Sequence, residues 1–267
     1  MKRVALTRWT SGQPARRVTD ELAAEEPLEI RVDTRSIAVV MRTPGHDEEL
    51  AAGFLVTEGL LRHRADLHEL RRDPRNRDGN VLDVFLAPGV TVDFARLTRH
   101  VFAASSCGLC GKTSIAAVRG RFPRARGRFV VTAERLLQLP AAMRAAQTTF
   151  ATTGGLHAAA LFTPAGELLC VREDVGRHNA VDKVIGRAFL DGRLPLDRQV
   201  LLVSGRSSFE IQQKALAAGL GFVAAVSAPS SLAVEFARRS GQTLVGFLRD
   251  DRFNVYAGKS RLRLARA

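Results

Sequence analysis

The sequence predicts an α/β protein with a smaller N-terminal α+β domain, residues 1–130, and an α/β domain, residues 131–267. In the second half, short apolar runs alternate with segments of helical periodicity, a pattern typical of β-α units. In the first half, strand-like runs surround one strong helical segment. The chain of 267 residues is 46% hydrophobic and 25% charged, so it can build a buried core and is not expected to be disordered.

The N-terminal half begins with a polar stretch, residues 1–26, which we expect to be frayed. Asp33-Thr34-Arg35 separates two strand-like runs and predicts a hairpin, and Thr43-Pro44-Gly45 breaks the chain before a helix. The first domain is expected to end in the loop that carries two cysteines. Its expected elements are strands at 28–32, 36–41, 67–71 and 80–86 and helices at 46–61 and 93–102.

The C-terminal half follows a basic stretch at 119–128, and the pattern changes there. Pro164-Ala165-Gly166 predicts a turn between two strands, and the later strands alternate with helices. This alternation predicts a largely parallel sheet. The expected helices are 133–146, 179–190, 209–218 and 232–239, and the expected strands are 157–162, 167–172, 199–203, 222–226 and 243–248.

The charge balance is strongly basic, with a net charge of +13. One interpretation is an anionic partner, and the other is an Arg-rich coding bias on a solvated surface; charge alone leaves both open. With one Trp and one Tyr the chain offers few stacking rings, so nucleic acid is not the expected partner. No apolar run approaches the roughly 20 residues of a membrane span, and no signal peptide is readable, so a cytoplasmic location is expected.

The three cysteines are Cys107, Cys110 and Cys170, an odd and low number that argues against a disulfide framework. Cys107 and Cys110 form a C-x-x-C pair next to Gly108 and Gly111, which suits exposed reactive thiols with a redox or sulfur-carrying role. A zinc site would need two more ligands at suitable spacing, so no metal is expected, and two buried small residues remain the structural alternative. Cys170, in an apolar strand, is expected to pack in the core.

Two segments combine Gly, Arg and hydrogen-bonding side chains between a strand and a helix: Glu173 to Lys183 and Ser204 to Glu210. The start of a helix favours phosphate, and ligands collect at the carboxyl ends of strands in open α/β sheets. Ordinary helix capping is the alternative. His157 is a further candidate for the ligand shell. The candidate binding residues of the two segments are Gly176, Arg177, His178, Ser204, Arg206 and Ser207.

These motifs together resemble the formate dehydrogenase accessory sulfurtransferases of the FdhD type, over the chain from Val18 to Tyr256. The most specific strings are Asp174-Val175-Gly176-Arg177-His178-Asn179 and Ser204-Gly205-Arg206-Ser207-Ser208-Phe209-Glu210, and the segment 42–54, the C-x-x-C and the segment 153–159 also match. The resemblance implies a larger domain with the cytidine deaminase fold, arranged α/β/α. The deaminase zinc signature is absent, so deaminase chemistry is not expected.

The resemblance also implies a function. Family members take persulfide sulfur from a cysteine desulfurase and pass it to the bis(molybdopterin guanine dinucleotide) molybdenum cofactor before that cofactor enters formate dehydrogenase. Cys107 would carry the persulfide. The exit segment would contribute to cofactor binding, although its spacing alone suits a charged exit loop. This segment consists of Phe247, Leu248, Arg249, Asp250, Asp251 and Arg252.

The expected mechanism is a sulfurtransferase with a persulfide intermediate, in which Cys110 could supply electrons by attacking Cys107. The two Gly/Arg turns would hold pyrophosphates, and Arg249 or Arg252 would bind a guanine or a phosphate. Two guanine nucleotides per cofactor fit a homodimer. The alternatives are a cofactor chaperone without a covalent sulfur step and a general thiol–disulfide oxidoreductase.

Overall fold

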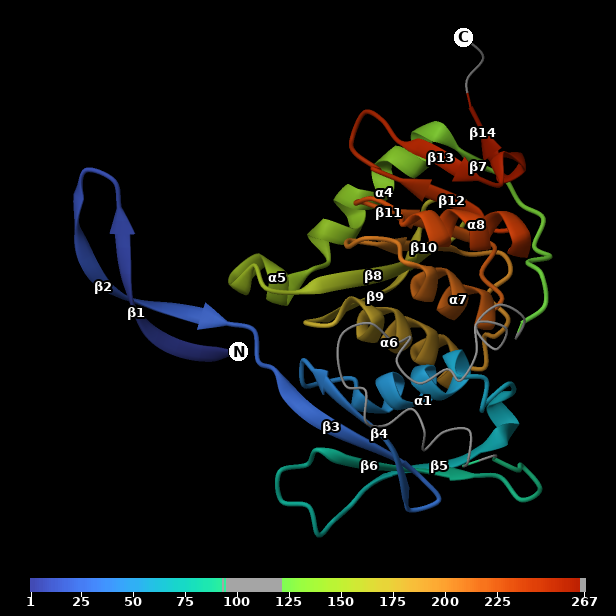
Figure 1. The fold of residues 1–267 in the computed structure, drawn as a ribbon, viewed down its shortest axis with the longest axis horizontal. Coiled ribbons are helices and arrows are strands. Elements are labelled where there is room, and N and C mark those ends of the chain that lie inside the picture. The colour runs from blue at the N-terminus through green and yellow to red at the C-terminus, as the bar shows by residue number, and fades with distance from the viewer. Residues whose placement is uncertain (93, 95–121, 265–267) are drawn as a thin grey trace.

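The four-stranded N-terminal sheet has the order β4-β3-β6-β5. The computed structural model describes residues 1–92, 94 and 122–264, so all of the predicted helix at 93–102 except residue 94 lies outside the described residues. Strands β3 and β4 form the predicted hairpin, and β3 also pairs in parallel with β6. One face of the sheet carries α1, which is shorter than predicted (Figure 1). The elements are β3 (Glu26–Val32), β4 (Arg35–Arg42), α1 (Asp47–Thr57), β5 (Leu67–Arg72) and β6 (Val81–Leu86).

The second sheet has six strands in the order β13-β12-β11-β10-β8-β9. Among its neighbouring pairs only β10–β11 and β11–β12 are parallel, so the prediction of a largely parallel sheet was wrong. The tight turn between β8 and β9 and the short return to β13 force antiparallel pairing, because a parallel pair needs a long crossover. The strands are β8 (His157–Phe162), β9 (Leu168–Asp174), β10 (Val200–Val203), β11 (Phe222–Ala225), β12 (Thr243–Gly246) and β13 (Asn254–Ala257).

Helices cover both faces of this sheet (Figure 1). Leu202 and Phe222 pack on the side of α4, whereas Leu201 and Val223 share a core with α6 and α7. Successive strand residues therefore point into different cores. Sequence analysis missed α5, β13 and the two-residue strands β7 (Val131–Thr132) and β14 (Leu262–Arg263). The helices are α4 (Ala133–Ala145), α5 (Thr148–Thr153), α6 (Arg177–Leu190), α7 (Phe209–Ala217) and α8 (Ser231–Ser240). The fold is mixed α/β, and its cytidine-deaminase assignment stays a prediction.

Helices α1 and α6 join the two sheets at very close range. A Cβ on Gly53 would lie 1.8 Å from the Asp182 carbonyl oxygen, so only glycine fits. Nearby, the Lys214 Nζ donates to the buried Asp182 carboxylate at 2.7 Å, and Thr57 Oγ1 donates to the same carboxylate. The largest hydrophobic cluster runs from the N-terminal sheet through α1 and α6 to the six-stranded sheet. The division at residue 130 stays a prediction.

The first 22 residues form a hairpin, so the expectation that this stretch is frayed was wrong. Strands β1 (Lys2–Thr10) and β2 (Gln13–Leu22) pair antiparallel and project from the body as an arm (Figure 1). The turn places Gly12 at φ 77°, which glycine adopts without strain. The prediction followed polarity and overlooked β-formers such as Val4 and Trp9.

Candidate functional site

The C-x-x-C pair, Cys107 and Cys110, lies outside the described residues, so its roles stay predictions. Cys170 is described and is a free thiol, half-buried and packed against the largest core cluster. Burial raises the pKa of the Cys170 thiol, which keeps it protonated and unreactive. This agrees with its predicted packing role. Within the described ranges no group of three or more His, Cys, Asp or Glu side chains could hold a metal ion.

The two predicted Gly/Arg turns meet at one edge of the six-stranded sheet, which we call the carboxyl edge. Strands β9, β10, β11 and β12 end there and β8 begins there, because β8 runs antiparallel to β9 and β10. A Cβ on Gly205 would lie 3.2 Å from His157 Nδ1 and 3.6 Å from the Arg177 Cδ. The turns before α6 and α7 are therefore side by side, as the expected multi-phosphate site requires.

The turn before α6 is built around the Asp174 carboxylate, which is fully buried. Its Oδ1 accepts hydrogen bonds from the Gly176 backbone N–H at 2.8 Å and from Asn179 Nδ2 at 2.9 Å. A Cβ on Gly176 would come within 2.9 Å of Asn179 Nδ2. A side chain at position 176 would therefore displace the Asn179 amide from Asp174, and any direct contact of Gly176 with a cofactor stays a prediction.

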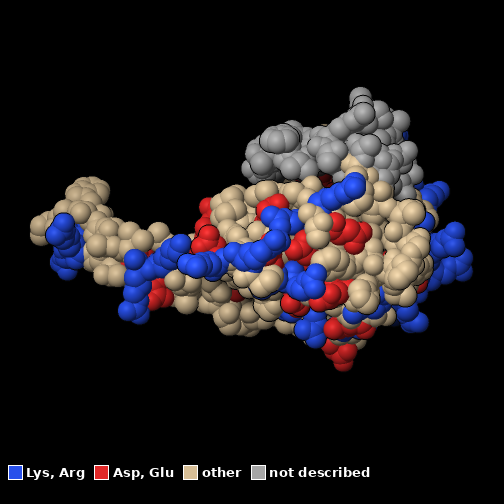
Figure 2. Space-filling model, turned by 90° about the horizontal axis from the view of Figure 1, so that it is seen from below, with Lys and Arg blue, Asp and Glu red and all other residues tan. Residues whose placement is uncertain are grey.

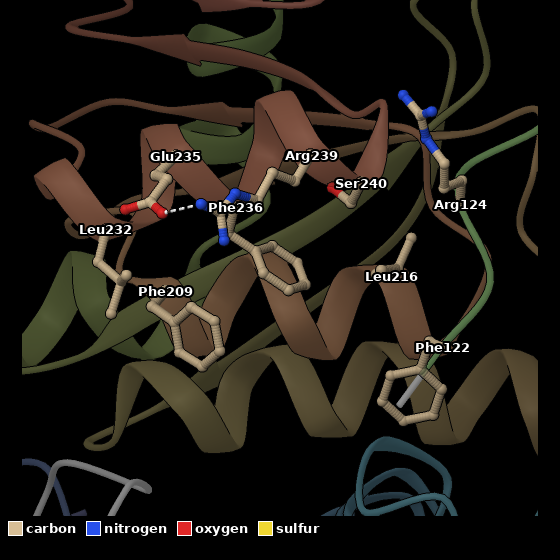
Figure 3. Close-up of a pocket in the computed structure, with 9 residues that line it drawn as sticks. All are labelled: Phe122, Arg124, Phe209, Leu216, Leu232, Glu235, Phe236, Arg239 and Ser240. Carbon is tan, nitrogen blue, oxygen red and sulfur yellow. Dashed lines mark ion pairs between the residues drawn. The ribbon is translucent and has the colours of Figure 1, made fainter. Parts of the chain in front are cut away.

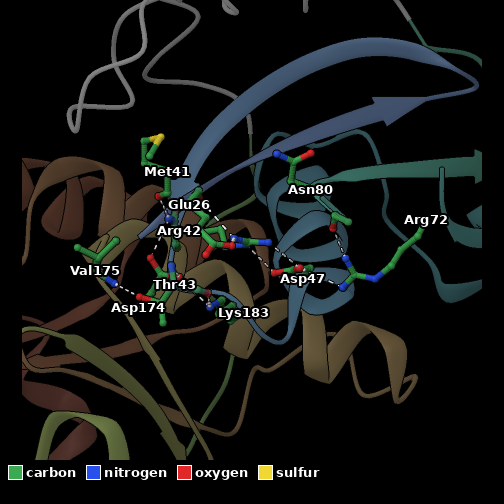
Figure 4. A network of polar contacts seen from close by, with 12 residues as sticks. Glu26, Met41, Arg42, Thr43, Asp47, Arg72, Asn80, Asp174, Val175 and Lys183 are labelled. Carbon is green, nitrogen blue, oxygen red and sulfur yellow. Dashed lines mark hydrogen bonds and ion pairs between the residues drawn. The ribbon is translucent and has the colours of Figure 1, made fainter. Parts of the chain in front are cut away.

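The other oxygen of Asp174 fastens this turn to the N-terminal sheet (Figure 4). Asp174 Oδ2 accepts from the Thr43 backbone N–H at 3.1 Å and from Lys183 Nζ at 2.7 Å. Lys183 Nζ also donates to the Thr43 carbonyl oxygen, and the Val175 N–H donates to Thr43 Oγ1. Sequence reasoning did not predict that Thr43 and Lys183 hold this turn to the N-terminal sheet. The available signal was that both segments, 42–54 and 174–183, match the family, and the fold brings the two together.

Asp47 continues this network at the start of α1 (Figure 4). The buried Asp47 carboxylate accepts two hydrogen bonds from Arg42, at 2.9 and 3.1 Å, and one from Arg72 at 3.0 Å. Burial alone would raise the pKa of Asp47, but the hydrogen bonds from Arg42 and Arg72 hold it below the ordinary value of 3.8. The network thus keeps the segment before α1 in place against α6.

We expect Asp47→Asn to reduce the free energy of unfolding by about 2 kcal/mol at neutral pH, because charged hydrogen bonds are lost. A carboxyl group whose pKa is lowered by folding contributes fully above its unfolded pKa of about 3.8 and loses that contribution as the pH falls further. The difference from the parent chain should therefore shrink below pH 3.8. Urea unfolding from pH 7 to pH 2.5 measures it, with exposed Glu48→Gln as control. A difference that is independent of pH would contradict this account.

A second polar cluster joins the starts of α6 and α7. His178 Nε2 lies 2.9 Å from Glu210 Oε2 and 3.4 Å from Ser208 Oγ. Glu210 is buried, and among the described residues its Oε1 has no hydrogen-bond partner. Arg177 Nε is also buried and has no partner within the same residues. Burial lowers the pKa of the half-buried His157, and the charge of Arg177 lowers it further. His157 therefore stays neutral in a cationic setting that favours an anion.

The two serine hydroxyls of the turn after β10 accept hydrogen bonds from other residues of the protein. Ser204 Oγ accepts from the Ala158 backbone N–H at 2.9 Å, and the buried Ser207 Oγ accepts from Gln212 Nε2 at 2.8 Å. Arg206, in the same turn, is exposed, and its contact with a ligand stays a prediction. Cofactor contacts by Ser204 and Ser207 stay predictions.

The exit segment after β12 mixes core and surface positions. Leu248 is fully buried, whereas Phe247 is 41% exposed and has a φ of 51°. The Phe247 N–H donates to the Ser227 carbonyl oxygen at 3.1 Å, and the Arg249 guanidinium donates to the Val226 carbonyl oxygen. This places the segment beside the loop after β11 at the carboxyl edge. Asp250, Asp251 and Arg252 are exposed there.

A separate groove of about 130 Å³ lies between α7 and α8 (Figure 3). Phe209 and Phe236 meet edge to face in it, with ring centroids 5.0 Å apart, and Glu235 pairs with Arg239 at 2.8 Å. None of the predicted cofactor-binding residues lines it. Phe and Leu side chains line the groove together with charged residues of α8 and Arg124, and the groove does not form part of the carboxyl edge.

No helix among the described residues is both long and apolar enough to cross a bilayer.

Comparison with known proteins agrees with these motifs. The model of the FdhD/NarQ family matches residues 23–263. "Sulfur carrier protein FdhD" of Streptomyces coelicolor is 56% identical over 256 residues, covering 93% of this chain and 91% of the relative. The protein of the same name from Mycobacterium tuberculosis is 54% identical over 253 residues, covering 91% and 92%.

A crystal structure from Desulfotalea psychrophila, named as that of a candidate formate dehydrogenase accessory protein, superposes with a TM-score of 0.77. It is 23% identical and covers 98% of this chain and 99% of that chain, which supports the fold. The family resemblance drawn from the motifs is confirmed: the chain belongs to the FdhD/NarQ family.

Proposed function

We propose that this protein is a sulfur carrier that accepts persulfide sulfur from a cysteine desulfurase and transfers it to the bis(molybdopterin guanine dinucleotide) molybdenum cofactor of formate dehydrogenase. The observation that carries the proposal is the shared name of relatives more than 50% identical over at least 91% of the chain, which are sulfur carrier proteins. The cytoplasm, where thiols stay reduced, is the compartment that suits this chemistry.

Cys107 is the proposed sulfur-carrying nucleophile. Its thiolate attacks the outer sulfur of the donor persulfide; a new S–S bond forms, the donor S–S bond breaks, and the donor cysteine leaves as a thiolate. Transfer of that sulfur to the cofactor as sulfide requires two electrons. Attack of the Cys110 thiolate on the Cys107 sulfur supplies them and leaves a Cys107–Cys110 disulfide, which an external dithiol reduces.

The carboxyl edge is the proposed cofactor site. Arg177 and Arg206 suit the pyrophosphates, since guanidinium groups bind phosphate oxygens in pairs and helix starts add positive potential. The unpartnered Arg177 Nε and Glu210 Oε1 offer a donor and an acceptor, and a guanine nucleotide needs both. The exposed Phe247 offers an aromatic face close to the same edge.

Mass spectrometry tests the carrier role directly. After incubation with a cysteine desulfurase and cysteine, and blocking of thiols, the peptide that contains Cys107 should gain one sulfur atom. The Cys170 peptide is the internal control and should stay unchanged, because its thiol is protonated and half-buried. Sulfur found only on Cys110, or on neither cysteine of the pair, would contradict the assignment.

Calorimetry with GDP tests the cofactor site. Each of Arg177→Gln and Arg206→Gln should weaken GDP binding roughly tenfold, since one charge-assisted contact to phosphate contributes about 1.5 kcal/mol or more. Arg198→Gln, which removes an exposed Arg just before β10 at the opposite edge of the sheet, is the matched control. Equal affinities for all three variants would place the nucleotide elsewhere.

A further inference from the structure

The side chains between α7 and α8 form a small hydrophobic cluster of their own, separate from the main core. Phe209, Leu216 and Phe236 are its buried members, and Phe122 and Leu232 pack against it and are only partly buried. The groove of about 130 Å³ between the two helices is lined by these five side chains together with polar ones (Figure 3). The groove therefore offers apolar surface from which a suitable side chain would displace water.

The volume of the groove suits one aromatic ring. An apolar cavity of about 150 Å³ is large enough for benzene, whereas a pocket for a whole small ligand usually has about 300 Å³ or more. Phe209 and Phe236 already meet edge to face, with an interplanar angle of 83°, and a third ring can pack against them in the same geometry. The groove of about 130 Å³ is therefore the right size for a single Phe or Tyr side chain.

The charges at the rim of the groove favour a negatively charged neighbour of that ring. Among the described residues that line the groove, the one acidic residue, Glu235, already pairs with Arg239 at 2.8 Å. Arg124 is exposed and forms no ion pair with another described residue. The Ala125 N–H donates to the Ser240 carbonyl oxygen at 2.9 Å, which holds the segment of Arg124 against the end of α8. One arginine at the rim is thus left for a carboxylate to match. Basic side chains are spread over much of the face of the molecule that Figure 2 shows, so charge alone does not single out this groove.

We propose that this groove docks an acidic segment of a partner protein: one Phe or Tyr side chain of the segment lies against Phe209 and Phe236, and a neighbouring carboxylate pairs with Arg124. Aromatic side chains that fill a pocket dominate the binding energy of many interfaces, and arginine is enriched among such residues. The ring supplies most of the affinity, and the carboxylate restricts the choice of partner. The inference stands on the groove, and it holds whether or not the sulfur chemistry proposed above is correct.

The groove lies next to two parts of the chain that have predicted roles. Phe209, at one end of the groove, begins α7, and the next residue, Glu210, contacts His178 at the carboxyl edge (Figure 3). Phe122, at the other end, is the first described residue after the segment that carries the C-x-x-C pair. A partner docked here meets the chain beside the carboxyl edge and beside the point at which that segment rejoins the described residues. This position, together with the small volume, favours a partner protein over a free metabolite.

Fluorescence anisotropy with a labelled synthetic peptide tests this docking site on the full chain. The probe carries one phenylalanine between two pairs of glutamates, and its two controls carry alanine for the phenylalanine or lysine for the glutamates. The parent protein should bind the probe at least tenfold more tightly than either control, because the net charge of +13 attracts every acidic peptide but only the ring fills the groove. No binding of the probe at millimolar concentration, or equal binding of the probe and its alanine control, would overturn the proposal.

Substitutions at the groove locate the contact. Leu232→Trp should fill the groove, so that the probe binds no better than its alanine control, and Arg124→Glu should weaken binding of the probe roughly tenfold. Leu168→Trp and Arg263→Glu, at exposed positions that do not line the groove, are the matched controls and should bind like the parent chain. Circular dichroism checks that each variant is folded, and the exposed Arg124 still tests the site if the tryptophan variant is unstable. Unchanged binding by both groove variants would contradict the assignment.

Two other occupants of the groove would give different results. If the parent chain does not bind the probe but Phe102→Ala does, a ring of the chain itself, from outside the described residues, fills the groove. If Leu232→Trp lowers the sedimentation coefficient of the protein, a second copy of the chain docks there. Either result would exclude the partner segment, and we expect neither.

Discussion

Replacing Cys107 with alanine is expected to lower the activation of formate dehydrogenase by roughly a thousandfold or more, because a covalent carrier without its nucleophile has no route for the sulfur. The change should leave GDP binding at the carboxyl edge intact, since binding there depends on other residues. Activation assays in cells that lack their own carrier, with calorimetry on the purified variant, measure the two effects separately.

Cys110→Ala is the matched control for this prediction. It removes the resolving thiol and keeps the carrier, so the Cys107 peptide should still gain sulfur, while repeated turnover falls. Full activation by Cys107→Ala would instead show a cofactor chaperone without a covalent step. Rapid reduction of unrelated disulfides by the parent chain would favour a general thiol–disulfide oxidoreductase.

Replacing Gly186 with alanine is expected to destabilise the protein by about 3 kcal/mol or more. Its Cβ would lie 1.7 Å from the Glu49 carbonyl oxygen on α1, closer than any real contact, so α1 and α6 must separate. The sign of this change in stability is informative, because replacing glycine with alanine inside a helix ordinarily stabilises a protein by up to about 1 kcal/mol. Urea unfolding monitored by circular dichroism measures the change.

Gly155→Ala is the control for this substitution, because its Cβ would make an ordinary contact, 3.7 Å from Ala23 Cβ. It should unfold like the parent chain. The substitution should also affect the carboxyl edge. Since α6 begins at Arg177, a shift of this helix should weaken GDP binding by Gly186→Ala in native buffer. A variant of Gly186 as stable as the parent would show that the two helices can separate without cost.

Local pattern predicted most elements correctly. The hairpin of β3 and β4, the turn before β9 and the helices α6, α7 and α8 follow from periodicity and turn residues. The errors arose where long-range contacts decide. The direction of β8 and β13 depends on loop length and pairing partners. The arm is a strand pair whose residues are mostly exposed in the described part of the chain.

The candidate site shows the same limit. The string from Asp174 to Lys183 was predicted to form part of a binding turn, and in the structure its residues make contacts on two sides. Asp174 and Lys183 face the N-terminal sheet and hold Thr43, while Arg177 lies beside Gly205 at the carboxyl edge. Periodicity cannot show that this helix start meets Thr43, because Thr43 is 131 residues away from Asp174 in the sequence.

The sequence by itself determined the chemistry: a close thiol pair, two Gly/Arg turns and the FdhD/NarQ membership. Only the tertiary structure decided which groups are free to act. Packing brings the turns before α6 and α7 together, makes the Ser204 and Ser207 hydroxyls accept hydrogen bonds within the protein, and leaves most of the arm exposed among the described residues. The physical reason is that residue type sets which bonds a side chain can form, whereas burial and long-range contacts set which of them are already made.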